Sequence, residues 1–326
     1  METRPAEKVI LVTGVTGAGK STFIQTITGD SNVVIGHGLH SSTQAIATYL
    51  AVIEGTEYRF LDTPGFNDTA RSEMDVLLCI TSWLCDLYCA NIRITGIIHV
   101  HRISDDRIQG SSFRYLRMLE ALCGETCMPN VILMTTHWDK VPIALGQERE
   151  SELRSGFWNQ MIQKGAQTAR FDGSATSGWK IAVSLKNCSP VVLAIQEQMI
   201  DQGRVLSETD AGQVMNEELV KIQRRTEIEL RHVQETLQSQ TQHNAQAQAD
   251  MAEYARGLEK ALQDAKMNQQ ALLAQTQRNR AEWEARFATL YKKMLEQQKK
   301  SFLNFVADVV TDVVKMGLTS AFGGGF

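Results

Sequence analysis

The 326-residue chain is poor in proline and, in its C-terminal part, also in glycine. All five prolines lie at or before residue 190, and between residues 213 and 316 there is a single glycine, Gly257. Both residue types interrupt regular structure, so their distribution predicts a domain with many turns first and a long helical region after it.

An excess of basic residues is also missing. Lys plus Arg total 33 and Asp plus Glu total 37, which leaves a net charge of −4. A general nucleic-acid binder needs surplus positive charge to displace the counterions of the phosphate backbone. We therefore expect no nucleic-acid partner.

Signals for secretion and membrane insertion are absent as well. The first eight residues, METRPAEK, contain no apolar core of a signal peptide, and no uncharged run reaches the ~18 residues of a spanning helix. The six cysteines include no C-x-x-C pair, which in a chain of this size is typical of reduced thiols. These absences favour a soluble, cytoplasmic protein.

Apolar runs alternate with amphipathic stretches over residues 1–187. Strands are expected at 8–13, 45–53, 58–61, 94–100, 131–135 and, more weakly, 167–171, with a hairpin turn at Glu54-Gly55. Helices are expected from Lys20 onward and at 72–90, 111–123, 148–164 and 177–186. Strands that alternate with helices predict an α/β domain with a mostly parallel sheet covered on both faces.

A helical linker is expected over residues 188–206. Ser189 would cap its helix, and Pro190 suits the first helical position. From 207 to 300 apolar residues recur at a 3-4 spacing that is typical of a coiled coil, although Gln, Asn and Arg occupy several seam positions. A straight helix of this length would measure on the order of 140 Å. The alternative is a single helix that lies on the globular domain.

Residues 301–326 combine an amphipathic helix with a glycine-rich tail. Apolar side chains gather on one face, and the opposite face carries Asp308 and Asp312. Because this polar face lacks the basic residues of an interfacial anchor, we expect packing against another helix or the globular domain, with membrane contact as the minority alternative.

The strongest chemical signal is a phosphate-binding loop. The residues from Gly14 to Ser21 satisfy G-x-x-x-x-G-K-[ST], directly after an expected strand and at the start of an expected helix. Lys20 should bridge the β- and γ-phosphates and Ser21 should bind Mg²⁺. The residues expected to hold the phosphates are Gly14, Thr16, Gly17, Ala18, Gly19, Lys20, Ser21 and Thr22.

Two further segments follow expected strands. In the first, Asp62 can hold Mg²⁺ through water and the Gly65 amide can meet the γ-phosphate. In the second, Thr136, His137 and Asp139 end a strand, and the Asp139 carboxylate can accept from both guanine N1–H and the exocyclic amine. This pattern favours guanine over adenine, and so GTP or GDP with Mg²⁺ over an ATPase.

The order of these motifs resembles GTPases of the septin-like branch of the TRAFAC class, which includes GIMAP-type GTPases, chloroplast Toc receptors and septins. Residues 97–107 and 133–139 look typical of fungal G-domain-containing proteins of this group. The resemblance covers about residues 8–205. It implies that Thr136 to Asp139 replace the usual Asn-Lys-x-Asp motif and that Ser174 lies in the last guanine-contacting loop.

The same resemblance implies that residues 36–44 form switch I. Thr43 would complete the Mg²⁺ shell and act with Lys20 and Gly65 at the γ-phosphate, with Ser41 and Ser42 as competitors. His37 and His40 could instead form a metal pair, but neither has a neighbouring Cys or carboxylate ligand.

Phe66 stands where Ras-like enzymes have a water-orienting Gln. Phe cannot position a nucleophile, so turnover should be slow. The missing group could come from His37, His40, Asp68 or a dimer partner.

Two functions are compatible with these sequence features. The first is a slow GTPase whose nucleotide state controls self-association, as a homodimer or with a coiled-coil partner, through its helical arm. The second is a septin-like scaffold that binds GTP with little turnover.

Overall fold

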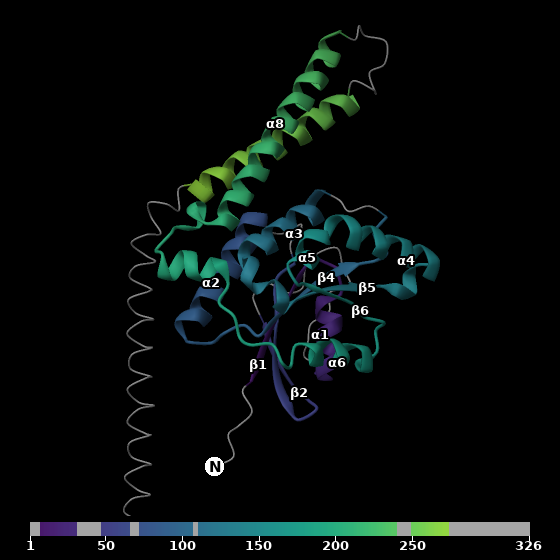
Figure 1. Cartoon of the computed structure of the whole chain (residues 1–326). Helices are drawn as coiled ribbons and strands as arrows, with labels where there is room; N and C mark the ends of the chain where they lie inside the picture. Colours follow the sequence, from purple (N-terminus) through teal and green to yellow (C-terminus); the bar gives the residue numbers. More distant parts are fainter. Residues whose placement is uncertain (1–6, 31–46, 66–71, 107–109, 240–248, 274–326) are drawn as a thin grey trace, which may run out of the picture.

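The computed structural model describes residues 7–30, 47–65, 72–106, 110–239 and 249–273. A six-stranded sheet forms the centre of this part of the chain, with helices on both faces (Figure 1). The strand order is β2-β3-β1-β4-β5-β6, and only β2 is antiparallel to its neighbour. The strands are β1 (Lys8–Gly14), β2 (Ala47–Ile53), β3 (Thr56–Asp62), β4 (Gly96–Arg102), β5 (Val131–Thr136) and β6 (Gln167–Arg170). The expected α/β class is confirmed.

Helices α1 and α6 cover one face of the sheet, and α2 and α3 cover the other (Figure 1). Serine side chains start two of them: Ser72 accepts from Asp75 N at the start of α2, and Ser174 accepts from Ser177 N at the start of α6. The helices are α1 (Lys20–Thr28), α2 (Glu73–Cys89), α3 (Gly110–Cys123), α4 (Ile143–Glu152), α5 (Asn159–Gln163), α6 (Ala175–Ser184), α7 (Ala194–Gln196) and α8 (Asp210–Ser239).

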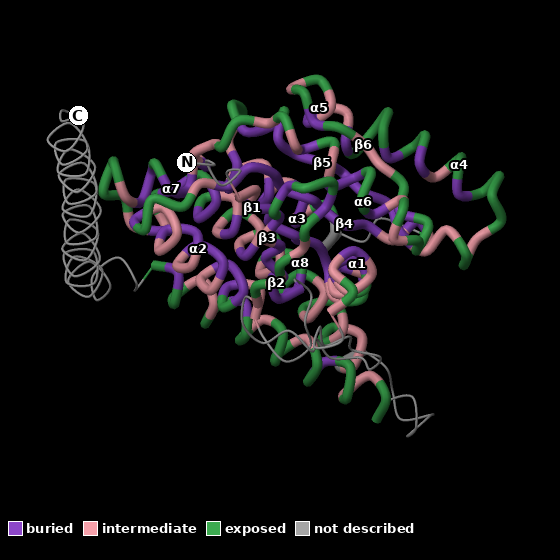
Figure 2. The backbone as a smooth tube through the Cα atoms, turned by 90° about the horizontal axis from the view of Figure 1, so that it is seen from below, coloured by how far each residue is buried: buried purple, intermediate pink, exposed green. Residues whose placement is uncertain are grey.

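The burial of the strands follows their place in the sheet. The central strands β1, β4 and β5 are buried almost throughout, as their runs of Val, Ile and Leu predict for parallel strands covered on both faces. The edge strand β2 alternates between partly covered and exposed positions. Buried segments accordingly concentrate in the central strands and the adjoining helices (Figure 2).

Some element boundaries differ from the sequence-based expectations. The helix expected over 148–164 begins earlier, at Ile143, and a π-helical turn, η3 (Leu153–Phe157), separates α4 from α5. The linker helix expected from Pro190 begins only at Ala194. The reason is that Val191 N donates to Ile94 O, and this isolated bridge holds the chain extended beyond Pro190.

The C-terminal region departs most from expectation. Instead of one straight helix over 207–300, α8 ends at Ser239, and residues 249–273 form a second helix that runs back beside it (Figure 1). Gln269 Nε2 donates to Asn216 Oδ1 at 2.9 Å, and Lys266 pairs with Glu227 at 3.0 Å. We call these two helices the helical hairpin. The described part of the seam therefore packs against a helix of the same chain. Residues 274–326, with the rest of the seam and the amphipathic segment, lie outside the described residues.

The base of the hairpin packs on α3. Met215 and Leu219 of α8 are buried there, and Leu272 of the returning helix is completely buried in the same core. Arg117 of α3 pairs with Glu217 at 3.1 Å and with Glu218 at 3.0 Å. The hairpin is therefore anchored to the α/β domain by apolar contacts and by charge.

All six cysteines are free thiols, as expected. Within the described ranges no cluster of three His, Cys, Asp or Glu side chains could hold a metal ion. None of the helices described in the structure has the length and apolar character needed to cross a bilayer.

Candidate nucleotide-binding site

The phosphate loop joins the carboxyl end of β1 to the start of α1. Position 14 requires glycine, because a Cβ there would lie 2.4 Å from the Val100 carbonyl oxygen of the neighbouring strand. Gly19 precedes α1 in a left-handed conformation, with φ of 95°, and offers no side chain to cap the helix. The first backbone N–H groups of α1 thus face a glycine-lined cradle, which suits a phosphate group.

Lys20 lies across this cradle and is only 7% exposed. Its Nζ donates to Gly14 O at 3.0 Å and to Val15 O at 3.1 Å, so the ammonium group is held over the loop. An ammonium group buried at the phosphate loop is well placed to pair with an anion. Lys20 therefore lies where the motif predicts.

The two expected Mg²⁺ ligands meet beside the loop. Ser21 Oγ donates to Asp62 Oδ2 at 2.8 Å, although the two residues are 41 positions apart. The β1–β3 register places Val12 opposite Asp62, and this brings the end of β3 to α1. A hydroxyl and a carboxylate at this spacing fit Mg²⁺, which prefers oxygen ligands and keeps several of its waters. Thr43, Ser41, Ser42, His37 and His40 lie outside the described residues.

Gly65 packs directly on the loop. A Cβ on Gly65 would lie 2.4 Å from Thr16 Oγ1 and 2.7 Å from Thr16 N. The Thr16 hydroxyl is buried and has no hydrogen-bond partner among the described residues. The backbone of Gly65 thus closes one side of the cradle, as its expected contact with a γ-phosphate requires, while Phe66 and Asp68 lie outside the described residues.

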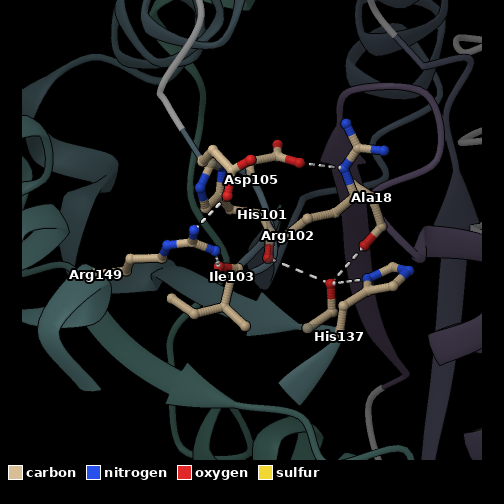
Figure 3. A network of polar contacts seen from close by, with 9 residues as sticks. Ala18, His101, Arg102, Ile103, Asp105, His137 and Arg149 are labelled. Carbon is tan, nitrogen blue, oxygen red and sulfur yellow. Dashed lines mark hydrogen bonds and ion pairs between the residues drawn. The ribbon is translucent and has the colours of Figure 1, made fainter. Parts of the chain in front are cut away.

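A hydrogen bond ties the base-recognition segment to the phosphate loop (Figure 3). Thr136 Oγ1 donates to Ala18 O at 2.7 Å and lies 2.9 Å from His137 Nδ1. Since the hydroxyl has one proton, His137 must donate through Nδ1–H. A Cβ on Gly19 would lie 3.5 Å from His137 Cε1, so the imidazole flanks the loop. Burial and the nearby Arg102 lower the pKa of His137, which favours the neutral ring.

Asp139 follows β5 and Ser174 follows β6, two neighbouring parallel strands that end at the same edge of the sheet. The Asp139 side chain is 69% exposed and pairs with Lys140 at 3.1 Å, and this contact lowers the pKa of the carboxyl group. Phe171 N donates to Thr135 O, which aligns the Ser174 loop with the end of β5. Hydrogen bonds from Ser174 and Ser177 lower the pKa of Asp172 to about 2 and fix that loop. Both expected base-contacting loops therefore lie beside one another.

Arg102 is a site residue that sequence reasoning did not assign a role. A Cβ on Gly17 would lie 3.3 Å from Arg102 Nη1, so the guanidinium group lies beside the phosphate loop. Asp105 pairs with Arg102 Nε at 2.9 Å, and Arg149 of α4 donates to Ile103 O at 3.0 Å (Figure 3). Its position at the end of β4 could have predicted this role. The carboxyl ends of parallel strands lie at the same edge of the sheet as the phosphate loop.

A family model described as 50S ribosome-binding GTPase matches residues 9–125, which include the phosphate loop, Asp62 and Gly65. This segment belongs to a P-loop GTPase G domain. The ligands of such a domain are a guanine nucleotide and Mg²⁺, in agreement with the sequence-based expectation. The glycine-lined cradle fits the phosphates of the nucleotide, and the Ser21–Asp62 pair fits Mg²⁺.

Two curated proteins match part of this chain. Translocase of chloroplast 90 from Arabidopsis thaliana is 27% identical over 132 residues, which is 39% of this chain and 16% of that protein. GTP-binding protein A from Dictyostelium discoideum is 26% identical over 132 residues, which is 40% of this chain and 28% of that protein. The chain thus matches less than a third of the length of either curated relative.

Solved structures resemble it at lower identity. Toc33 from Arabidopsis thaliana, in complex with Mg²⁺ and GMPPNP, has a TM-score of 0.46 and 16% identity over 56% of this chain and 84% of that one. Era from Aquifex aeolicus, bound to GDP·AlF4⁻, has a TM-score of 0.44 and 15% identity over 57% of this chain and 58% of that one.

Proposed function

We propose that this protein is a slow GTPase of the septin-like, GIMAP-type branch, whose nucleotide state controls self-association or partner docking through the helical hairpin. One observation carries the proposal: Thr136 Oγ1 donates to Ala18 O, and so joins the base-recognition segment to the phosphate loop. A single ligand that contacts both must have a base and a phosphate chain, as GTP does.

The residues divide the chemistry among them. The Lys20 ammonium group offsets negative charge that develops on the β–γ bridging oxygen. Ser21 and Asp62 would hold Mg²⁺, which supplies positive charge at the phosphates when bound. The Gly65 amide orients the γ-phosphate, and Asp139 selects guanine.

Slow turnover follows from the residue after Gly65. Phe66 has no polar group that could orient the attacking water. Arg102, beside Gly17, adds positive charge near the phosphates but cannot act as a base at neutral pH. A polar group from a second copy of the chain would supply what one G domain lacks.

Three ion pairs made by two arginines of α3 support coupling between the site and the hairpin. Arg114 pairs with Glu73, the first residue of α2, at 2.8 Å. In the sequence, only residues 66–71 separate Gly65 from Ser72, the N-cap of α2. Arg117, three positions further along α3, pairs with Glu217 and Glu218 of the hairpin. A nucleotide-dependent shift of α2 would therefore reach the hairpin through one helix.

The test is phosphate release per molecule of full-length protein across a hundredfold dilution, in the wild type and in Arg117→Met. We expect the rate per molecule to rise with concentration, because association supplies the missing group, and we expect Arg117→Met to weaken that rise. Lys266→Met is the matched control, because the Lys266–Glu227 ion pair lies within the hairpin and does not touch the G domain.

Three outcomes are decisive for this proposal. A flat but substantial rate at every dilution would mean that one G domain carries its own catalytic group. Negligible turnover at every concentration, with GTP bound, would favour a GTP-binding scaffold. Equal effects of Arg117→Met and Lys266→Met would contradict coupling through α3.

A further inference from the structure

The side chain of Trp138, between His137 and Asp139, is held on three sides. Its Nε1–H donates to Thr135 Oγ1 at 3.0 Å, which fixes one end of the indole. The Arg170 guanidinium group lies over the ring, 4.4 Å from its centroid. On a third side the backbone of α4 closes in, because a Cβ on Gly146 would lie 2.7 Å from Trp138 Cζ3.

Arg170 is itself held in place. Two of its nitrogens, Nε and Nη2, donate to the carboxylate of Glu150, with Nε at 2.9 Å from Oε1. The Glu150 side chain is only 11% exposed, and Glu150 lies one turn after Gly146 on the same face of α4. A planar guanidinium fixed by a fork of hydrogen bonds makes a rigid surface for the indole. We call Trp138, Arg170 and Glu150 the tryptophan stack.

The Asp139 side chain makes few contacts that would fix its position. Its side chain is 69% exposed, and among the described residues its one ion pair is with the adjacent Lys140. Asp139 and Trp138 share a single 3-10 turn, Trp138–Lys140. The direction of the carboxylate is therefore set by the backbone of this turn, and the turn is anchored through Trp138.

We infer that the tryptophan stack positions Asp139 for guanine, so that Trp138, Arg170 and Glu150 determine base specificity without touching the nucleotide. This inference rests on the proposed function, in which Asp139 reads the base. Two carboxylate oxygens must meet guanine N1–H and the 2-amino group together, and such a paired contact tolerates small displacements only. Loosening the stack should weaken this paired contact and leave the phosphate contacts of Lys20 and the glycine loop intact.

The experiment compares GDP with IDP, which differs only in lacking the 2-amino group. Dissociation constants are measured on full-length protein by calorimetry for the wild type and for the double variant Glu150→Ala/Arg170→Ala. The double change removes the stack without leaving a buried, unpaired carboxylate. The wild type should prefer GDP by about tenfold or more, since one charge-assisted hydrogen bond separates the two ligands.

In the double variant the preference for GDP should fall at least about threefold, mainly through weaker GDP binding, while IDP binding changes by less than about threefold. Trp138→Phe, which keeps an aromatic ring but loses the Nε1–H donor, should move the ratio in the same direction by less. Arg154→Ala is the control, because Arg154 donates to Thr168 Oγ1 on the same strand as Arg170 but is not part of the stack.

An unchanged GDP-to-IDP ratio in a folded double variant would overturn this inference and leave the proposed function standing. Equal weakening of both nucleotides would do the same, since it would show a purely structural role. A wild type that binds both nucleotides equally, or neither, would overturn the assignment of Asp139 and, with it, the proposed function.

Discussion

Replacing Gly65 with alanine tests the contact between the end of β3 and the phosphate loop. The new Cβ would lie 2.7 Å from both Thr16 N and Thr16 Cα, whereas ordinary contact begins near 3.4 Å. The two backbones must therefore separate by roughly 0.7 Å, because neither of these Thr16 atoms can rotate away as a side chain could. Forced separations of this kind cost about 1–3 kcal/mol in packed interiors.

This cost should fall mainly on the triphosphate state. Under the proposed function only GTP needs the Gly65 amide close to the loop, whereas GDP leaves the segment free to withdraw. We expect Gly65→Ala to weaken binding of a non-hydrolysable GTP analogue by about tenfold to a hundredfold, and binding of GDP by less than about threefold. Stopped-flow titrations with fluorescent forms of both nucleotides measure the two constants.

The control is Gly257→Ala in the hairpin. A Cβ there meets no atom within 4 Å, and residue 257 lies inside a helix. Alanine should therefore stabilise the protein by about 0.5–1 kcal/mol and leave both affinities unchanged. Equal losses of GDP and GTP analogue affinity in Gly65→Ala would refute the assignment of Gly65 to the γ-phosphate.

Three further variants test other parts of the site and the core. Lys20→Ala should abolish nucleotide binding yet melt as a folded protein, and unchanged GTP affinity in a binding titration would remove Lys20 from the site. Asp139→Asn should weaken GTP binding and improve xanthine nucleotide binding, because the amide can donate to the additional carbonyl of xanthine. Competition assays with GTP, XTP and ATP check this. Equal affinity of the wild type for ATP and GTP would contradict it. Burial, His101 and Lys20 lower the pKa of His99 to about 3. Between pH 6.5 and 3 the unfolded chain therefore binds more protons than the folded one. The free energy of unfolding should fall by about 2 kcal/mol from neutral pH to pH 5. Urea unfolding at several pH values should show a shallower fall for His99→Leu, and parallel curves for the two proteins would exclude this origin.

The parts of the site that sequence patterns predicted are those built from contiguous residues. The strand, glycine loop and lysine from Lys8 to Ser21 determine one another locally, and a parallel sheet brings the ends of its strands to one edge. The positions of Asp62, Gly65 and Thr136 followed from that rule, and the structure places all three at the loop.

The contacts that were missed depend on register between distant segments. Arg102 reaches Gly17 only because Gly14 pairs with Val100, and a shift of one residue would turn its side chain to the other face of the sheet. The tryptophan stack likewise joins three elements, the 3-10 turn Trp138–Lys140, β6 and α4, and its ion pair links residues 20 positions apart. No periodicity or motif in a single sequence encodes such pairings.

The helical hairpin shows how one pattern can serve two structures. A 3-4 repeat states that a helix has an apolar stripe, but not whether the stripe meets a second chain or the same one. In the described part of the chain, amide side chains bond across the two helices of the hairpin. Gln269 lies between Asn216 and Gln223 and bonds to both, so these amides satisfy one another inside the hairpin.

This arrangement bears on the self-association proposed above. In a two-chain coiled coil, buried amides lower stability, and here the described part of the seam is already occupied by the returning helix. A second chain would have to displace residues 249–273 or approach the outward faces, where Ile228 is 68% and Met267 51% exposed. The outward route requires no unfolding of the hairpin and leaves the Arg117 ion pairs to α3 intact. Under the proposed function, association through these outer faces would bring two G domains together while the Arg117 ion pairs to α3 persist.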